Sequence, residues 1–224
     1  MSYQFQFGWI ADYAPLLISG IGVTLQLILI GAVFGIALGI VCAWVRALGP
    51  AWLRPVVATY VELIRNTPFL IQLFFIFFGL PSLGVQMSEL QAANLAMIVN
   101  LGAYSCEIVR AGIQATPRGQ FEAGASLAMT PFETFRHVVL VPALGRIWPA
   151  LSSQVVIVML GSAVVSQIGA EDLTYAASYI QSRNFRAFET YIASTIIYLA
   201  LAILIRKAMN LVGDAVLARR EEAR

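Results

Sequence analysis

The sequence predicts an all-α integral membrane protein with about five membrane-spanning helices. Hydrophobic residues make up 59% of the 224 residues and charged residues only 12%, which is far from the usual composition of soluble domains. The mean hydropathy is +0.80. Several stretches contain the roughly 20 apolar residues that a helix needs to cross a lipid bilayer. The net charge of only +2 gives no support for nucleic-acid binding.

Five stretches are expected to span the membrane. They are residues 13–45, 60–88, 90–106 with a continuation to Arg110, 147–170 and 190–205. The first stretch carries no charged residue, and only Glu62 and Arg65 interrupt the second. Because five is an odd number, the two ends of the chain are expected on opposite sides of the membrane.

The basic residues are unequally divided between the two sides of this arrangement. Cytoplasmic loops near membrane spans collect Lys and Arg. Arg183 and Arg186 stand alone on one side, and twelve basic residues lie at or near the other: Arg46, Arg54, Arg65, Arg110, Arg118, Arg136, Arg146, Arg206, Lys207, Arg219, Arg220 and Arg224. We therefore expect the N-terminus outside, and the stretch 116–149 and the C-terminal tail in the cytoplasm.

The first span carries three glycines at four-residue spacing, Gly31, Gly35 and Gly39. Such a row lets a second helix approach closely, so it predicts a packed neighbour in the same chain or in another. The alternative is a run of glycines without any contact. Thr24 and Gln26 are polar residues of the same span and are expected to hydrogen-bond across helices.

Charged and polar residues mark the second span. Glu62 and Arg65 are three residues apart and are expected to neutralise each other. The following Asn66-Thr67-Pro68 should interrupt the helix, because proline lacks an N–H and disfavours helical geometry at the residue before it. Broken backbone at membrane depth needs protein or a water-filled cavity beside it. The hypothesis is that this corner faces the inner mouth of a translocation path; the alternative is a salt bridge that anchors the helix at the interface.

The third span repeats the acid-before-arginine spacing, with Glu107 and Arg110 following Tyr104. The fourth span holds hydroxyl and amide side chains, namely Ser152, Ser153, Gln154, Ser162, Ser166 and Gln167. These side chains suit hydrogen bonding to a zwitterion, although polar residues more often join helices to each other.

The stretch from Thr116 to Pro149 is charged and still helical in pattern. Thr116 and Pro117 form a helix start, with a capping residue before a first-turn proline. Thr130 and Glu133 have the spacing of a capping box. Two short helices are therefore predicted, over residues 117–128 and over 131 to about 141. On spacing alone, a well-capped cytoplasmic loop explains this stretch equally well.

Part of this stretch resembles the EAA loop of binding-protein-dependent ABC importer permeases. The resemblance rests on Glu122-Ala123-Gly124, Ala128, Val139-Leu140 and Pro142. Residues 103–114 and 62–68 resemble the polar amino-acid branch of that family, and the likeness extends over about residues 15–212. The sequence departs from the pattern at three points, where Gly124 replaces the second Ala, Ala128 replaces the Gly, and the proline comes one place late.

The resemblance implies the type I ABC importer fold, with a permease domain over residues 16–212 between an external segment (1–15) and a cytoplasmic tail (213–224). It implies that a pair of ATPase subunits binds the coupling loop 116–146 and rocks two identical or homologous permeases between inward-open and outward-open states. The expected coupling residues are Glu122, Ala123, Gly124, Leu127, Thr130, Pro131 and Phe132. The expected path residues are Glu62, Arg65, Thr67, Tyr104, Glu107, Arg110, Gln154, Ser162 and Ser166.

The family resemblance further implies a location in the bacterial inner membrane and a periplasmic solute-binding protein that delivers a polar amino acid or a derivative such as an opine. One position differs from these relatives. Many polar amino-acid permeases show Lys-Asp-Thr-Ser in the fourth span, where this chain has Leu160-Gly161-Ser162-Ala163. A charged contribution to ligand recognition is therefore absent at that point.

Residues 171–177 and 181–189 are expected to form the largest external loop. Arg183 and Arg186 are its basic residues, and they are the predicted contact for the solute-binding protein. A solvated loop without a partner is the alternative reading.

The sequence shows no catalytic machinery. It has no G-x-x-x-x-G-K-[ST] phosphate loop, so ATP and magnesium are expected on a separate ATPase and no cofactor on this chain. Cys42 and Cys106 show no metal-ligand spacing and are expected to pack as apolar residues. The N-terminal segment lacks the pattern of a signal peptide. Two rival readings are a self-contained secondary transporter or channel, which should show inverted repeats, and a non-transporting membrane scaffold.

Overall fold

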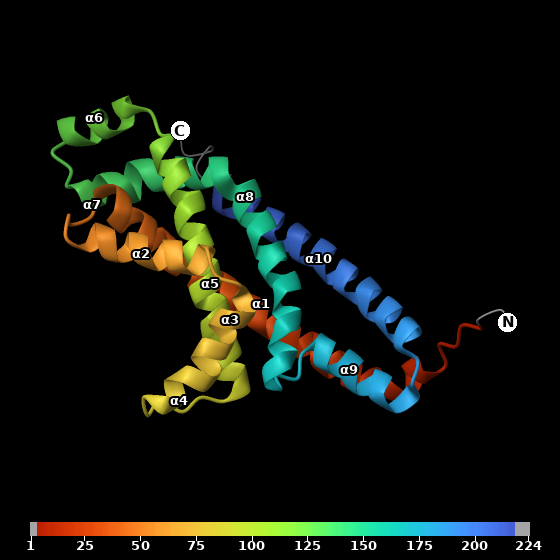
Figure 1. Ribbon diagram of the computed structural model, residues 1–224. Coiled ribbons are helices and arrows are strands. Elements are labelled where there is room, and N and C mark those ends of the chain that lie inside the picture. Colours follow the sequence, from red (N-terminus) through yellow and green to blue (C-terminus); the bar gives the residue numbers. More distant parts are fainter. Residues whose placement is uncertain (1–3, 218–224) are drawn as a thin grey trace.

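The computed structural model describes residues 4–217, and these residues fold almost entirely into helices (Figure 1). The elements are α1 (Trp9–Leu48), α2 (Leu53–Arg65), α3 (Phe69–Phe74), the π-helical segment η1 (Phe75–Gly79), α4 (Leu80–Ser82), α5 (Glu89–Gln114), α6 (Arg118–Ser126), α7 (Pro131–Thr134), the π-helical segment η2 (Phe135–Val139), α8 (Leu140–Gly161), the 3-10 segment η3 (Ser162–Ile168), α9 (Leu173–Asn184) and α10 (Ala187–Leu217). The predicted all-α class is confirmed.

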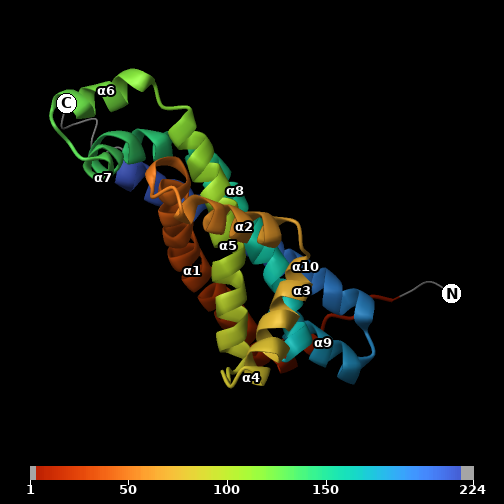
Figure 2. The ribbon, with the colours of Figure 1, turned by 60° about the vertical axis from the view of Figure 1, so that its left-hand side comes forward.

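Four helical stretches are long and apolar enough to cross a membrane, namely Trp9–Leu48, Glu89–Gln114, Pro131–Ile168 and Ala187–Ala215. They contain the first, third and fifth predicted spans and all but the last two residues of the fourth, 147–170. The second predicted span is not one straight helix, because α2 and the helix Phe69–Ser82 meet at an angle of 113°. Figure 2 shows this turn between α2 and α3. The break falls at Thr67-Pro68, where the backbone cannot continue as an α-helix.

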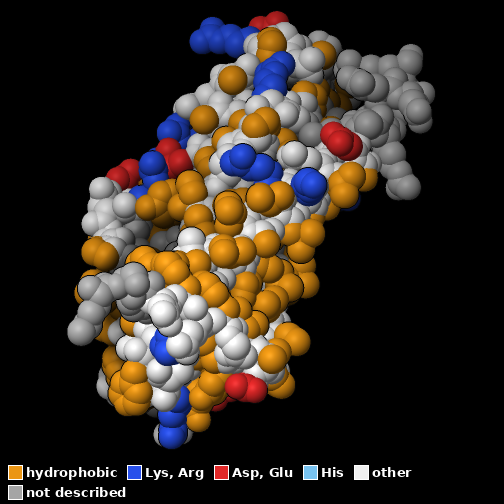
Figure 3. Space-filling model, turned by 90° about the vertical axis from the view of Figure 1, so that its right-hand side faces the viewer, with side chains coloured by type: hydrophobic (Ala, Val, Ile, Leu, Met, Phe, Trp, Pro, Cys, Tyr) orange, Lys and Arg blue, Asp and Glu red, His pale blue; other side chains and the backbone are white. Residues whose placement is uncertain are grey.

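The molecule is elongated, with α6 and α7 at one end and α9 at the other (Figures 1 and 2). These are called the α6 end and the α9 end. On the face drawn in Figure 3, hydrophobic side chains cover the middle of the molecule, and charged side chains gather towards its two ends. This banded surface is the one expected of a protein whose middle lies in a bilayer.

The glycine row of α1 packs against α5, so the neighbouring helix that the row predicted lies in the same chain. Gly31 lies against Met97 and Gly35 against Leu101, and a Cβ added to Gly39 would stand only 2.4 Å from the Cβ of Ser105. Thr24 is buried, and its Oγ1 accepts a hydrogen bond from the Leu173 N–H at 3.2 Å. Gln26 is exposed instead of buried between helices.

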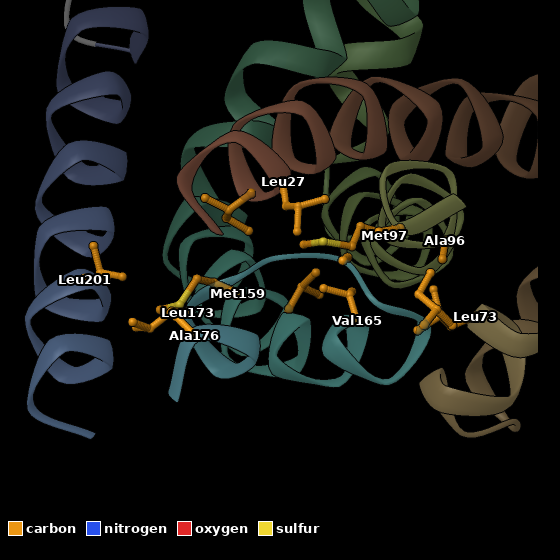
Figure 4. Packing of buried hydrophobic residues seen from close by; sticks show 14 of the residues in the cluster. Leu27, Leu73, Ala96, Met97, Met159, Val165, Leu173, Ala176 and Leu201 are labelled. Atoms are coloured by element: carbon orange, nitrogen blue, oxygen red, sulfur yellow. The ribbon is translucent and has the colours of Figure 1, made fainter. Parts of the chain in front are cut away.

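The core lies where α1, α5, α8, η3, α9 and α10 meet (Figure 4). Its largest side chains include Leu27, Met97, Met159 and Leu173, which are fully buried. A second apolar cluster near the α6 end contains Cys42, Cys106, Val109, Phe135 and Leu151. Both cysteines are buried free thiols in this cluster, as the sequence predicted.

One predicted helix end was wrong. The helix that begins at Pro131 does not end near residue 141 but continues through Ile168, so the second short helix forms the first turns of the fourth span. Pro142 is tolerated in this helix because it follows the π-helical segment η2, where the α-helical hydrogen bonding is already interrupted. The other short helix, α6, lies within its predicted range.

The expected external loop is also wrong in part, because residues 173–184 form the helix α9. Asp172 caps this helix, and its Oδ1 accepts the Tyr175 N–H at 2.9 Å. The buried residues Leu173, Ala176, Ala177 and Ile180 recur every three or four positions and pack α9 into the core. Because charged and polar residues lie between these positions, the segment was predicted to be a loop.

Candidate transport site and coupling loop

A cavity of about 400 Å³ opens where the break between α2 and α3 faces α5 and α8. We call it the central cavity. Its lining consists of Thr67, Pro68, Phe69, Asn100, Tyr104, Gln154, Ile157, Val158 and Gly161. Hydroxyl and amide groups thus converge from three elements on an otherwise apolar space, and none of the lining residues is charged. Such a cavity suits a small polar molecule that is held by hydrogen bonds.

Three of the predicted path residues line this cavity, namely Thr67, Tyr104 and Gln154. Ser162 and Ser166 do not line it. The Ser162 hydroxyl is buried and donates to the Met159 carbonyl at 2.7 Å, and the Ser166 hydroxyl donates to the Ala163 carbonyl at 2.8 Å. Their hydroxyl protons are therefore used within their own helical segment. The Thr67 hydroxyl likewise donates to the Leu63 carbonyl at 2.7 Å, but Thr67 lies in the cavity lining and the two serines do not.

Gln72 stabilises the break beside the cavity, a role that was not predicted from the sequence. Its Nε2 donates to the carbonyls of Ile64 at 2.7 Å and Thr67 at 2.9 Å, and its Oε1 accepts from Asn100 Nδ2 at 2.9 Å. These carbonyls lose their helical partners at the break and would otherwise be unpaired at membrane depth. A single amide in the apolar run after a proline break was the available signal for Gln72 and, through it, for Asn100.

The predicted pair between Glu62 and Arg65 does not form. Glu62 is exposed and accepts a hydrogen bond from Asn66 Nδ2 at 3.1 Å, whereas Arg65 Nη1 lies 3.8 Å from Glu107 Oε2. The reason is that α2 runs past α5, so the last residue of α2 reaches a carboxylate on its neighbour. The Arg65 guanidinium also lies 5.7 Å from the centre of the Tyr104 ring, within the range of a cation–π contact.

Glu107 is surrounded by three guanidinium groups. The predicted partner Arg110 is confirmed, with Nη2 at 2.7 Å from Oε2. Arg46 of α1 forms a second ion pair with Glu107, and Arg65 of α2 is the third basic neighbour. The Glu107 side chain is only 17% exposed, so it joins α1, α2 and α5 through charges that are largely shielded from water. The group begins next to the central cavity and extends towards the α6 end.

The coupling loop is held by a close contact between α6 and α7. Gly124 is buried, and a Cβ at this position would lie 2.6 Å from both Oγ1 and Cγ2 of Thr134. The expected capping box is present, with Thr130 Oγ1 accepting from the Glu133 N–H at 3.3 Å and Glu133 Oε2 accepting from the Thr130 N–H at 2.8 Å. Ala128 has φ of 55°, in the left-handed region that favours glycine.

The other predicted coupling residues differ in exposure. Glu122 and Ala123 are exposed on α6, and Leu127 has 74% of its surface accessible. Phe132 is 50% exposed, and the centres of the Phe132 and Trp44 rings lie 5.6 Å apart in a T-shaped arrangement. Exposed large apolar residues beside a carboxylate form a surface that suits a protein partner.

The two arginines at the α9 end make contacts within the chain. The Arg183 guanidinium lies 5.2 Å from the centre of the Tyr179 ring. Arg186 Nη1 donates to Oε1 of the fully buried Glu189 at 3.1 Å. Arg183 is the more exposed of the two. The structure thus gives Arg186 an internal role that its position in the sequence did not indicate.

Asp172 is a fully buried acid at this end. Its Oδ2 accepts a hydrogen bond from the Tyr198 hydroxyl at 3.2 Å, in addition to the capping bond of its Oδ1. Burial disfavours the charged form more than these bonds favour it, and the pKa of Asp172 is raised to about 6. Asp172 thereby connects α9 with Tyr198 of α10. The next residue, Leu173, connects α9 with Thr24 of α1.

Comparison with known proteins gives consistent matches over nearly the whole chain. Residues 35–218 match the family described as binding-protein-dependent transport system inner membrane component. The chain is 33% identical to the glutamine transport system permease protein GlnP of Escherichia coli (strain K12) over 204 residues, which cover 89% of this chain and 93% of that protein. It is 34% identical to the L-cystine transport system permease protein TcyB of Bacillus subtilis (strain 168), covering 90% and 86% of the two chains.

Two solved structures share the fold. One is described as a crystal structure of an amino acid ABC transporter with histidines; it has a TM-score of 0.83 and 36% identity, and the match covers 95% of this chain and all of that one. The MetNI methionine ABC transporter in an inward-facing conformation has a TM-score of 0.76 at 24% identity over 90% of this chain and 96% of that one, and supports the fold alone. The family match over residues 35–218, the matches over nearly the whole chain and the shared helical fold agree with one another. The chain therefore belongs to the family of binding-protein-dependent transport system inner membrane components, the permease subunits of ABC importers.

Proposed function

We propose that this permease carries a polar amino acid, or a derivative such as an opine, across the bacterial inner membrane by ATP-driven alternating access. The observation that carries the proposal is the central cavity, where Thr67, Asn100, Tyr104 and Gln154 offer uncharged hydrogen-bonding groups beside a broken helix. The similarity to permeases of glutamine and cystine transport systems supports an amino-acid ligand. The exposed residues of the coupling loop supply the surface through which ATP hydrolysis acts.

The cavity favours a ligand with a neutral side chain. Gly161 lines it at the position where many polar amino-acid permeases have aspartate, so no carboxylate waits there for a cationic side chain. Arg65 stacks on the cavity residue Tyr104, and its side chain is 37% exposed, which places one positive charge close to the cavity. A zwitterion with its carboxylate towards Arg65 and its side chain towards Gln154 satisfies both features.

The ATPase subunits, which hold ATP and magnesium, bind the α6 end in this proposal. Glu122, Ala123, Leu127 and Phe132 form the contact, and the packing of Gly124 on Thr134 transmits the movement of α6 to the helix that begins at Pro131. The α6 end is then cytoplasmic and the α9 end periplasmic, in line with the distribution of basic residues. A periplasmic solute-binding protein contacts the α9 end, with Arg183 as its more exposed basic residue.

A second permease, identical or homologous, completes the transporter, and nucleotide binding shifts the equilibrium by favouring one of the two states. The test is reconstitution of the full complex with its solute-binding protein in proteoliposomes. Amino acids that bind the solute-binding protein should stimulate ATP hydrolysis and accumulate inside. Leu127→Asp should abolish the stimulation, and thermal unfolding should show that this variant of the permease still folds.

Two results would contradict the proposal. Uptake by the permease alone, driven by an ion gradient, would instead support a secondary transporter. A coupling loop that reacts with a membrane-impermeant thiol reagent added outside intact cells, tested with a cysteine at Leu127, would reverse the orientation and exclude the ATPase contact.

A further inference from the structure

A second cavity lies at the α6 end, where three elements bring arginines together. It has a volume of about 370 Å³ and is lined by Arg46, Ala47, Leu48, Arg110, Ile113, Gln114, Thr116, Arg118 and Phe121. The first three residues are at the end of α1, the next three at the end of α5, and the last two on α6. None of the residues that line the cavity is acidic. We call it the arginine cavity.

The positive charge of this region is not balanced within the described chain. Glu107 is the shared partner of Arg46, Arg65 and Arg110, so one carboxylate faces three guanidinium groups. Arg118 is exposed, and within residues 4–217 it makes no ion pair. A cavity with surplus guanidinium groups attracts an anion, and guanidinium binds phosphate through paired N–H donors.

The helix ends around the cavity do not cancel this attraction. The carbonyl ends of α1 and α5 carry partial negative charge, but other arginines already pair with them. Arg54 Nε donates to the Gly49 carbonyl at 3.0 Å, and Arg146 Nη1 donates to the Ala115 carbonyl at 3.0 Å. Arg118 therefore remains available to a bound anion, and Arg46 and Arg110 can contribute the N–H groups that do not contact Glu107.

The remaining lining identifies the source of the anion. Leu48, Ile113 and Phe121 supply apolar surface next to the guanidinium groups. The cavity lies at the ends of two membrane helices, and the 73% exposed Trp52 follows the end of α1; tryptophan is enriched at the bilayer interface. The phosphate of a phospholipid can pair with the guanidinium groups while its acyl chains contact the apolar residues. Basic pockets between helices at the cytoplasmic surface are known to bind anionic lipids.

We propose that the arginine cavity binds the phosphate of an anionic phospholipid. The proposal rests on the proposed function only in placing the α6 end at the cytoplasmic leaflet. In this site the phosphate pairs with Arg118 of α6 and with the outer N–H groups of Arg46 and Arg110, and so ties the coupling loop to the ends of α1 and α5. Anionic lipid is then a condition for a well-positioned α6.

The test measures lipid retained on the purified full chain by native mass spectrometry, with phosphatidylglycerol compared with phosphatidylcholine. Wild type should prefer phosphatidylglycerol. Arg118→Gln should weaken this binding about fivefold, the effect expected for one basic residue near an anionic surface. Gln114→Glu, an isosteric change that adds a negative charge to the lining, should weaken it at least as much, and Arg118→Lys should retain most of it.

Arg136→Gln is the matched control, because Arg136 is also exposed at the α6 end but does not line the cavity. If Arg136→Gln loses as much binding as Arg118→Gln, the attraction is a general surface effect and the proposal is wrong. It is also wrong if free inorganic phosphate binds and the lipid does not. The proposal is likewise wrong if the complex with the ATPase excludes the lipid completely, because an acidic side chain of that partner then occupies the arginine cavity. Thermal unfolding of each variant shows that it is folded.

This result is independent of the transport assay. Loss of lipid preference with intact ATP-coupled uptake would remove only the lipid site. Retention of lipid by a chain that needs no ATPase would remove the proposed function and leave the site.

Discussion

Two substitutions relative to the EAA pattern, at Gly124 and Ala128, become understandable from their surroundings. The family pattern has Ala where this chain has Gly124, and the structure shows why Gly is needed here, since Thr134 fills the space that a Cβ would occupy. The pattern has Gly where this chain has Ala128, and that residue adopts φ of 55°, which costs an L-residue about 1 kcal/mol. The chain thus has a close contact at one position and backbone strain at the other.

Gly124→Ala should destabilise the α6–α7 contact by about 1–3 kcal/mol, because overpacking forces neighbouring atoms apart. The combined variant with Thr134→Ala should recover much of this loss, since the two clashing atoms, Oγ1 and Cγ2, are removed.

Ala128→Gly should instead stabilise the loop by up to about 1 kcal/mol. Thermal unfolding in detergent measures all three. Equal stability of Gly124→Ala and wild type would show that the loop relaxes around the new methyl group.

Gln72→Leu should destabilise the protein by about 1–3 kcal/mol, because the carbonyls of Ile64 and Thr67 lose a donor at membrane depth. Asn100 would lose its partner as well. Gln26→Leu is the control, since it makes the same chemical change at an exposed amide of a membrane span, where leucine is favoured over a polar side chain and no destabilisation is expected. Chemical or thermal unfolding of the two variants side by side distinguishes a role of Gln72 at the break from a general effect of removing an amide.

At the scale of elements, one carboxylate and one helix cap hold several helices together. Glu107 connects α1, α2 and α5, and Asp172 starts α9 while contacting α10. The sequence identified the pair of Glu107 with Arg110 because both are on one helix at a spacing with known geometry. It missed Arg46 and Arg65 as partners because contacts between helices depend on packing that local spacing does not encode. It missed α9 for the same reason.

Glu107→Gln should loosen the junction of α1, α2 and α5. Removing the carboxylate from a fully buried ion pair costs about 3–5 kcal/mol, and the partial exposure of these side chains reduces the expected loss to about 1–3 kcal/mol. Glu107→Asp should keep part of the stability. The rate of amide hydrogen exchange in α2 measures this loosening, and it should rise in Glu107→Gln. A change confined to α10 would contradict this account.

The raised pKa of Asp172 predicts that stability depends on pH. The folded pKa of about 6 exceeds the ordinary pKa of an aspartate, 3.8, so the folded state binds the proton more tightly than the unfolded state. The contribution of Asp172 to stability is therefore complete below about pH 4 and falls as pH rises through 6. Asp172→Asn, which still offers an oxygen to the Tyr175 N–H, should remove this part of the pH dependence, whereas Asp172→Ala should also lose the cap, about 1 kcal/mol. Unfolding midpoints between pH 4 and 7 test the sign.

At the scale of the whole molecule, composition and hydropathy were sufficient for the class and for four of the helical spans. The broken second span could be predicted as a break at Pro68 but not as an angle, because the direction of α3 is set by its contacts with α5 and η3. The cavity was only partly predictable. Thr67, Tyr104 and Gln154 stood out as polar residues of apolar spans, whereas Ser162 and Ser166 looked the same in the sequence and lie outside the cavity lining.

Gly161→Asp should change which ligands the cavity accepts. A Cβ at Gly161 would meet no atom within 4 Å, so the larger side chain has room. The added carboxylate should weaken transport of amino acids with neutral side chains and favour cationic ones, as charge complementarity requires. Competition of arginine and glutamine for uptake in the reconstituted complex measures the shift. Gly161→Asn, with the same shape and no charge, should not produce it.

The helix from Pro131 to Ile168 has a mechanical consequence. Its 38 residues continue without a connecting loop from Thr134, near its start, to Gln154, in the wall of the cavity. The π-helical segment η2 lies between these two residues, and the helix bends between α7 and the part of α8 beside the cavity (Figure 1). In the proposed transport cycle, a push from α6 on Thr134 therefore reaches Gln154 through continuous helical backbone and displaces the cavity wall without any loop that must first become ordered.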